Sequence, residues 1–283
     1  MANAMCLTLL ALLPCGWMWS AETEPPPAAG PAADTLRAFD LYVRLTESRL
    51  DALVQDRDGF VWADTPERRT RLRSGAIMCV PRRATWGVTA PHGLIHDWIG
   101  AAFIPDATVG QVLALLQDYD HHKDVYGPDV MDSKILDRNG NDFKVRLRLF
   151  KRKAVVVVLD TDNEIHYRPA GGRDWRSRSN STRIVEIANA GTPRERERPA
   201  GSDHGYLWRL NSYWLFRERD GGTYVECEAV SLSRSVPAEL APLIRPIITG
   251  LPRDAMANTM RRTREMVLAR IAGNGQEDPP RRR

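Results

Sequence analysis

The chain has 283 residues, of which 43% are hydrophobic and 27% are charged. These proportions are ordinary for a globular protein, and the length allows one large domain or one domain with an annex. The 40 basic residues only slightly exceed the 36 acidic ones, which gives a net charge of +4. So small an excess argues against nucleic acid as a partner.

The first segment, Met1–Ala21, carries no charged side chain and includes an apolar run from Cys6 to Leu13. Because this run is too short to cross a membrane, it is typical of a secretory signal peptide. No basic residue precedes it, so an apolar anchor or a misassigned start codon is the alternative. Residues 22–33 are rich in proline and alanine and are predicted to form a linker. We therefore expect an exported protein, either periplasmic or secreted.

Residues 34–91 are predicted to form an N-terminal helical extension. Apolar residues recur at helical spacing from Leu36 to Leu53, and Asp34 is suited to cap the first turn. A short strand is predicted at Gly75–Pro81. The sequence of this region does not indicate its role.

The middle of the chain is predicted to consist mostly of strands. The first, Leu94–Ile104, ends at Pro105, and Asp106-Ala107-Thr108 then caps a helix at Val109–Gln117. Hairpin turns are predicted at Asp137-Arg138-Asn139-Gly140 and at Asp220-Gly221-Gly222. The remaining predicted strands are Val130–Leu136, Phe143–Phe150, Ala154–Asp160 with an extension to Arg168, Trp175–Ile187, Tyr206–Arg219 and Thr223–Val236.

The alternation of side chains along these strands predicts which face of the sheet is buried. In Phe143–Phe150 every second residue is apolar and the residues between them are basic, so one face of this strand should be wet. In Tyr206–Arg219, Trp208 and Trp214 share one parity, which we expect to face inward. Tyr213 and Leu215 share the other parity. In the last strand Glu226 and Glu228 are expected to face outward, with small residues facing inward.

The last predicted element is an amphipathic helical run punctuated by prolines, Pro237–Ile271. Pro252 is expected in the first turn of its uninterrupted part, Ala255–Ile271, because a missing N–H costs nothing there. The intervening arginines should face solvent. The stripe predicted to face the sheet consists of Met256, Met260, Thr263, Val267 and Ile271.

Three local patterns then occur in a fixed order along the chain. They are Ile104-Pro105-Asp106-Ala107-Thr108 before a helix ending in Asp118-Tyr119-Asp120; Ser212-Tyr213-Trp214-Leu215-Phe216 with Gly222-Thr223-Tyr224-Val225-Glu226-Cys227-Glu228; and Ser235-Val236-Pro237 before Leu251-Pro252-Arg253-Asp254. In these patterns the chain from about Leu94 to Ile271 resembles the START-like superfamily, also called SRPBCC, which includes lipid-transfer and polyketide cyclase-like proteins.

The resemblance implies an α+β helix-grip fold, in which a curved antiparallel β-sheet wraps around a long C-terminal α-helix and encloses a cavity. It implies a START-like ligand-binding domain at residues 92–272, which leaves 273–283 as a disordered basic tail. The function it implies is non-catalytic binding or transport of a hydrophobic small molecule, of the lipid kind. Each methylene moved from water into such a cavity contributes roughly 0.8 kcal/mol, so few polar contacts are needed.

The predicted cavity wall combines the inward strand residues with the apolar stripe of the last helix. The same residues could equally be ordinary core, because the core and the cavity wall are one surface in this fold. The predicted lining residues are Val145, Leu147, Leu149, Trp208, Leu210, Ser212, Trp214, Val225, Cys227, Ala229, Met256 and Met260.

No catalytic residue, cofactor or metal site is expected. The chain has no nucleophile elbow, phosphate-binding loop or HExxH motif. His121 and His122 lie in a polar loop without a defined set of further ligands, and the sequence identifies no partner for His204. Whether Cys79 and Cys227 pair cannot be read from their spacing, and Cys227 fits a small buried residue in a strand.

Two other functions stay open at this point. A cyclase- or hydratase-type enzyme would need an acid or base in the cavity, for which Ser212 alone is a weak candidate. A protein-interaction module could use the charged loop at Arg194–Arg198. The basic stretch from Arg146 to Lys153 offers transient contact with a membrane surface, or is a solvated strand face that protects a sheet edge. The oligomeric state is left open.

Overall fold

The computed structural model describes residues 30–55, 62–83, 87–152, 156–235 and 241–274, and the side chains of 241–251 lie outside this description. The helices are α1 (Ala33–Gln55), α2 (Pro66–Arg73), α3 (Val109–Leu116), α4 (His122–Tyr126) and α5 (Ala241–Asn274), with a 3₁₀ turn η1 at Tyr119–His121. The strands are β1 (Met78–Pro81), β2 (Val88–Ala90), β3 (Gly93–Pro105), β4 (Val130–Asn139), β5 (Asp142–Arg152), β6 (Val156–Gly171), β7 (Asp174–Ala188), β8 (Arg196–Glu197), β9 (Arg209–Arg219) and β10 (Gly222–Arg234).

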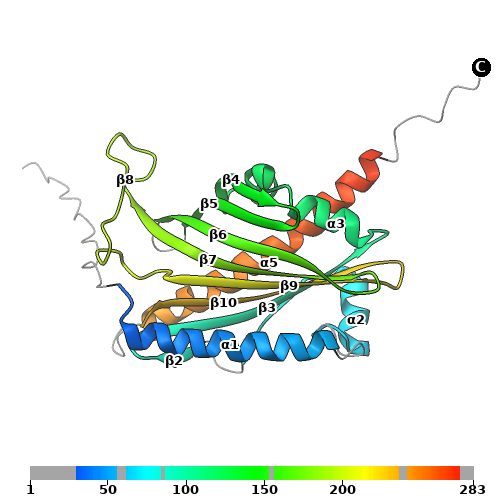
Figure 1. The fold of residues 1–283 in the computed structure, drawn as a ribbon, viewed down its shortest axis with the longest axis horizontal. Coiled ribbons are helices and arrows are strands. Elements are labelled where there is room, and N and C mark those ends of the chain that lie inside the picture. The colour runs from blue at the N-terminus through cyan, green and yellow to red at the C-terminus, as the bar shows by residue number, and fades with distance from the viewer. Residues whose placement is uncertain (1–29, 56–61, 84–86, 153–155, 236–240, 275–283) are drawn as a thin grey trace, which may run out of the picture.

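The strands form one antiparallel sheet in the order β1-β3-β10-β9-β7-β6-β5-β4, with β2 paired to β3 and β8 paired to β7. The sheet is curved, and α5 crosses one of its faces while α1 lies along the other (Figure 1). We call the face toward α5 the inner face and the opposite one the outer face. This arrangement confirms the predicted curved antiparallel sheet with a long C-terminal helix and a helical N-terminal extension.

The hairpin turns fall where the sequence predicts them. Between β9 and β10, Asp220 and Gly221 have φ values of 58° and 76°. Gly140 has a φ of 59° between β4 and β5. Glycine tolerates this left-handed region, and aspartate is among the few other residues that enter it readily. The turns therefore fix the register of both hairpins.

Helix α3 begins where the capping residues predict. The Thr108 side chain accepts a hydrogen bond from Gln111 N, and the Gln111 side chain accepts one from Thr108 N. This reciprocal capping box satisfies two backbone donors that the first turn leaves free. The helix then packs Val112 and Leu115, both fully buried, against the inner-face core.

The long C-terminal helix differs from its prediction at its start. It begins at Ala241, so Pro252 lies inside the helix and the predicted start of an uninterrupted helix near Ala255 is wrong. A proline inside a helix removes one hydrogen bond at a cost of about 3 kcal/mol, which tertiary packing can offset. The predicted stripe is confirmed at Met260, Thr263 and Val267, each at most 1% exposed.

Helix α1 covers the outer face over β3, β9 and β10. Its residues Phe39 and Leu50 pack in one cluster with Tyr213 and Leu215 of β9. These two β9 residues do face away from α5, as their parity predicts, but they are only 2% and 3% exposed. The N-terminal extension therefore buries the β9 residues that face away from α5.

The region before β3 is part of the sheet as well as a helical extension. The predicted strand at Gly75–Pro81 is observed as β1, which pairs with β3. Cys79 of β1 lies opposite Gly100 of β3. Residues 1–29 and 275–283, which include the predicted signal peptide and most of the basic tail, lie outside the described residues. Among the described helices, none is both long and apolar enough to cross a membrane.

Candidate functional site

The inner face of the sheet carries α5 at a point of very close approach. Cys227 is paired in register with Trp214 on one side and with Gly100 on the other. A Cβ atom at Gly100 would lie 2.5 Å from Met256 Cγ and 3.0 Å from Met260 Cγ. Only glycine allows the helix to sit so low on the strand, so this position fixes α5 over β3 and β10.

Most of the predicted lining residues lie on this inner face. The apolar cluster beneath α3, α4 and the C-terminal half of α5 contains Val145, Leu147 and Val225. A smaller cluster under the middle of α5 contains Cys227, Ala229, Met256 and Met260. Trp214 packs against both clusters, so it lies between them.

Three further predicted residues are placed on the inner face by the strand register. Leu149 is paired with Leu159, Leu210 with Ser231, and Ser212 with Ala229. This agrees with the predicted parity. That a ligand contacts any of these residues remains a prediction.

Trp208 is not placed with the inner-face residues. It precedes β9, so the alternation of that strand does not extend to it. The structure groups it with Tyr213 and Leu215 in the cluster that packs against α1, and its Nε1 donates to Asp203 Oδ1 at 2.9 Å. The prediction that Trp208 shares the environment of Trp214 is therefore wrong.

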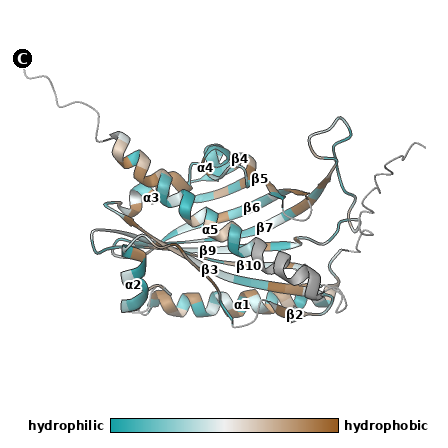
Figure 2. Ribbon diagram, turned by 180° about the vertical axis from the view of Figure 1, so that it is seen from behind, coloured by the Kyte–Doolittle hydropathy of each residue, from teal (hydrophilic) through white to brown (hydrophobic). Residues whose placement is uncertain are grey.

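Several apolar side chains on the inner face are only partly buried, although helices stand over the same face. Figure 2 shows α5 crossing the sheet obliquely while β5, β6 and β7 extend beyond it. On the outer face, by contrast, the apolar residues under α1 are almost fully buried. Solvent therefore reaches apolar surface beside α5. The partly buried inner-face residues are Leu147, Leu149, Ile184, Leu210 and Trp214.

The cysteines on this face do not form a disulfide. Cys79 and Cys227 are both free thiols and flank Gly100 on the neighbouring strands β1 and β10. Burial raises the pKa of Cys79 to about 11 and that of Cys227 well above its usual value. Both are therefore uncharged packing residues, as predicted for Cys227.

No protein-family model and no curated protein matches the chain. A solved structure from Thermus thermophilus is similar at 18% identity and a TM-score of 0.44, covering 60% of this chain and 96% of its own. A STAR-related lipid transfer protein from Xanthomonas axonopodis is similar at 16% identity and a TM-score of 0.44, covering 67% of this chain and 98% of its own.

A third similar structure is the Zhui aromatase/cyclase of a Streptomyces species, at 11% identity and a TM-score of 0.44. It covers 64% of this chain and 98% of its own. The decisive observation is this chain's own topology, a curved antiparallel sheet with a long C-terminal helix against its inner face. The chain has a helix-grip fold.

The helix-grip sheet also carries polar inner-face residues that sequence reasoning missed. Strand β7 contains Ser177, Ser179 and Ser181 at every second position, and Ser179 is paired with Ser212 of β9. On β6, Thr161 and Asn163 are buried on the same face. The Ser-x-Ser-x-Ser repeat is visible in the sequence, but the alternation alone does not show which face of the sheet the serines occupy.

A hydrogen-bonded group of aromatic residues closes the inner face near α3 and α4. Tyr119 and Tyr167 hydroxyls lie 2.7 Å apart, and Tyr126 is bonded to Thr263 of α5 at 2.9 Å. Burial raises the pKa of Tyr119 and Tyr167 well above the usual range, and that of Tyr126 to about 12. Such phenols keep their protons, so they are structural donors and acceptors in this helix-grip domain rather than bases.

His122 belongs to the same end of the fold. Its Nε2 is 3.0 Å from Leu116 O, and burial lowers its pKa to about 4. The neighbouring His121 points outward to Asp118 at 2.6 Å. The two histidines therefore have separate environments, and within the described residues no group of three or more His, Cys, Asp or Glu side chains could hold a metal ion.

His204 has a partner that the sequence did not reveal. Its Nδ1 lies 2.5 Å from Glu186 Oε1, which also accepts a hydrogen bond from Arg198 Nε at 3.1 Å. Glu186 Oε2 accepts a third bond from His204 N at 2.9 Å. Both carboxylate oxygens are thus occupied by the loop between β7 and β9. The Glu186 carboxylate therefore holds that loop in place and is not available as a general base.

The outer face holds a buried cluster of acidic residues beneath α1. Asp97 Oδ2 accepts a hydrogen bond from Tyr42 OH at 2.7 Å, and Glu228 forms an ion pair with Arg49. Burial, followed by the charge of Glu228, raises the pKa of Asp97 to about 7. These contacts attach α1 to β3 and β10.

Glu226 makes the corresponding attachment for the segment after α1. It accepts hydrogen bonds from Trp62 N at 3.0 Å and Ala63 N at 3.1 Å. Burial raises its pKa to about 7, against the effect of those two backbone donors. Glu226 and Glu228 therefore face away from α5 as predicted, but they are buried at 4% and 2% exposure instead of facing solvent.

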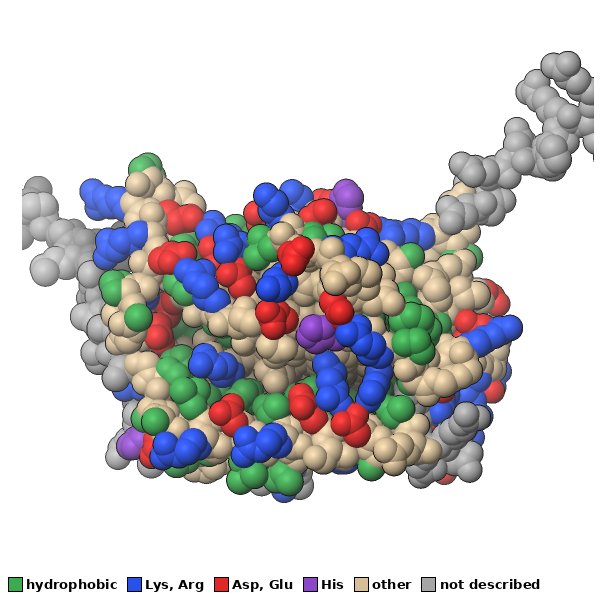
Figure 3. Space-filling view, in the orientation of Figure 1, with side chains coloured by type: hydrophobic (Ala, Val, Ile, Leu, Met, Phe, Trp, Pro, Cys, Tyr) green, Lys and Arg blue, Asp and Glu red, His purple; other side chains and the backbone are tan. Residues whose placement is uncertain are grey.

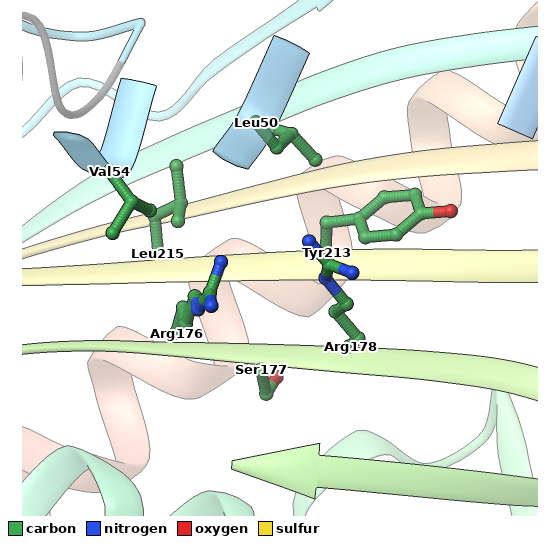
Figure 4. A pocket seen from close by; sticks show the side chains of 7 residues that line it. All are labelled: Leu50, Val54, Arg176, Ser177, Arg178, Tyr213 and Leu215. Carbon is green, nitrogen blue, oxygen red and sulfur yellow. The ribbon is translucent and has the colours of Figure 1, made fainter. Parts of the chain in front are cut away.

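A small pocket on the outer face lies between α1 and strands β7 and β9 (Figure 4). Its volume is about 10 Å³, and Leu50 and Val54 of α1 form one wall while Tyr213 and Leu215 of β9 form another. The space is about that of one water molecule. It is therefore too small for the expected ligand and lies on the wrong side of the sheet.

The rest of the outer face is covered by paired charges, and basic and acidic side chains lie interspersed there (Figure 3). Arg146 forms two hydrogen bonds with Asp162, and Arg148 forms two with Asp160. The neighbouring strand thus neutralises Arg146 and Arg148 of the basic stretch. This favours the solvated strand face, and contact with a membrane stays a prediction.

Proposed function

We propose that this chain binds a hydrophobic small molecule of the lipid kind, without catalysing a reaction on it, between the inner face of the sheet and α5. The observation that carries the proposal is the partly exposed apolar surface beside α5, at Trp214, Leu210 and Leu147. Their partial exposure beside α5 provides apolar surface that a ligand can cover.

Binding is favoured over catalysis by the chemistry of the inner face. Among the described residues there, the tyrosines hold their protons and both carboxylate oxygens of Glu186 already accept hydrogen bonds. Ser212, the weak candidate for a cyclase or hydratase, is paired with Ala229 and Ser179, neither of which can activate it. Apolar burial at roughly 0.8 kcal/mol per methylene then supplies the affinity.

Replacing Trp214 by alanine tests this proposal. We expect a neutral fluorescent apolar probe to bind about tenfold more weakly, because a large part of the apolar wall is removed. Trp62→Ala is the matched control, since Trp62 is a partly buried tryptophan on the outer face. Both variants should lower the free energy of unfolding by about 2–3 kcal/mol, less than a fully buried tryptophan would. Equal probe affinity in the two variants would show that Trp214 does not line the site.

The natural ligand can be sought directly. Native mass spectrometry of protein purified from its own host should show a co-purified apolar molecule that organic solvent extracts. A turned-over substrate would favour the enzyme reading, and a stably bound protein would favour the interaction module.

Export is a separate proposal that rests on the sequence. Residues 1–21 are apolar and uncharged and precede a proline-rich linker, as in a cleaved signal peptide. N-terminal sequencing of protein from the host is expected to begin near Glu22. A mature chain that begins at Met1 or Ala2 would contradict it.

A further inference from the structure

The inner face of β7 carries a row of serines where apolar residues would be expected. Ser177, Ser179 and Ser181 alternate with Arg176 and Arg178, and alternate residues of a strand point to opposite faces. Figure 4 shows both arginines on the α1 side of β7 and Ser177 on the other side. The three hydroxyls therefore share the face that α5 crosses.

The first of these hydroxyls is unsatisfied. Ser177 is only 2% exposed, and its Oγ has no hydrogen-bond partner in the part of the chain that the structure describes. It lies in register between Trp214 of β9 and Tyr167 of β6. A buried hydroxyl without a partner is destabilising, and such groups are rare in folded proteins unless a ligand or water completes them.

The other serines differ from Ser177 in a useful way. Ser181 Oγ already accepts a hydrogen bond from Leu210 N at 2.9 Å, so its role is structural. Ser179 and its register partner Ser212 are partly exposed, next to the partly exposed indole of Trp214. Hydroxyls and apolar surface therefore lie side by side where solvent reaches the inner face.

A second unsatisfied group lies on another strand, in the cross-strand row of the sheet that contains Ser179. Register pairing connects Trp98 of β3 to Ala229, Ala229 to Ser212, and Ser212 to Ser179. Trp98 is 7% exposed, and its Nε1 lacks a hydrogen-bond partner among the described residues. Three inter-strand spacings separate Trp98 from Ser179, or roughly 14 Å. The row thus offers donors at both ends of a stretch of small side chains.

We propose that the site selects an elongated apolar molecule that carries hydroxyl or carbonyl oxygens along its body, through Ser177, Ser179 and Trp98. This inference rests on the proposed function, and it narrows the ligand class. A simple acyl chain would cover the apolar surface but leave these groups unsatisfied. A molecule with oxygens between its ends would form hydrogen bonds with these groups. A simple acyl ligand would bind more weakly, because it would leave the same groups buried without partners.

The test compares stearic acid with its 9-, 10- and 12-hydroxy derivatives by displacement of a neutral fluorescent probe from the full chain, below micellar concentrations. At least one derivative is expected to bind about 2- to 10-fold more tightly than stearic acid, the effect of one hydrogen bond between neutral groups. The double variant Ser177→Ala/Ser179→Ala should lose this preference and still bind stearic acid. Thr182→Ala, at an exposed position in the bulge of the same strand, should keep it.

A second readout separates recognition from folding. Because Ser177 Oγ makes no bond within the described protein, Ser177→Ala should not lower the Tm of the ligand-free chain. The inference is overturned if no derivative binds more tightly than stearic acid, or if the double variant keeps the preference. If neither stearic acid nor any derivative displaces the probe, the proposed function fails together with it.

Discussion

Replacing Met260 by aspartate is expected to lower the free energy of unfolding by at least about 4 kcal/mol. Met260 is 0% exposed, and it packs with Met256 and Cys227 where α5 sits on Gly100. The substitution removes buried apolar volume and places a carboxyl group among the apolar side chains of this cluster. Thermal unfolding should show a Tm lower by roughly 10–15 °C for a domain of this size. The variant should also fail to bind an apolar probe specifically, because α5 can no longer close the inner face.

Two controls make this result specific to burial. Met260→Leu keeps the volume and the apolar character, so it should cost less than about 1.5 kcal/mol. Arg261→Ala changes the adjacent exposed residue and should leave Tm and probe binding unchanged. Arg262 is a less suitable control than Arg261, because its Nε donates a hydrogen bond to Val125 O at 2.8 Å. If Met260→Asp retained the wild-type Tm, α5 would not grip the sheet at this point.

The sheet could be predicted from the sequence because its signals are local. Alternating side chains and the turn residues at Gly140 and Gly221 determine strand, register and face within a few residues of each other. The start of α5 could not be predicted in this way. Pro252 is a strong local signal for a helix start, but the packing of a long helix on the sheet outweighs one missing hydrogen bond.

The outer face shows what local patterns cannot supply. The parity of Tyr213, Glu226 and Glu228 was predictable, but their burial was not. It depends on α1, which is more than 150 residues away in sequence and packs there through Phe39 and Leu50. The sequence of an amphipathic helix does not show which surface the helix covers. Polar strand residues beneath it therefore have the same sequence pattern as residues that face solvent.

The candidate site was predictable in part for the same reason. Trp214 and Cys227 follow strand parity and lie on the inner face. Trp208 lies one residue before β9, where parity no longer applies. Ser177 was missed because a serine in a strand reads as solvent-facing until the neighbouring strands fix its face.

The buried acids beneath α1 make stability depend on pH in an unusual direction. Burial raises the folded-state pKa of Asp97 and of Glu226 to about 7, from ordinary values of 3.8 and 4.5. Between about pH 4 and pH 7 the folded chain therefore holds protons that the unfolded chain has released. Stability from these two groups is fully present below pH 4 and is lost as pH rises through 7.

The double variant Asp97→Asn/Glu226→Gln isolates this contribution. Its stability relative to the wild type should increase by up to about 5 kcal/mol between pH 5 and pH 8, roughly half from each group, because neutral amides do not ionise. Urea unfolding at both pH values measures the difference. Comparison with the wild type is needed because His122, whose pKa burial lowers to about 4, contributes with the opposite sign in both proteins.

Asp162→Asn is the matched control on the same sheet. Asp162 forms two hydrogen bonds with Arg146, which lower its pKa below the ordinary value of 3.8, so it stays ionised in both states between pH 5 and pH 8. This variant should therefore run parallel to the wild type over that range. If the Asp97/Glu226 variant also ran parallel, the two carboxyls would be ionised in the folded chain. The attachment of α1 would then depend on full charge pairing with Arg49 and Arg82 rather than on protonated acids under a helix.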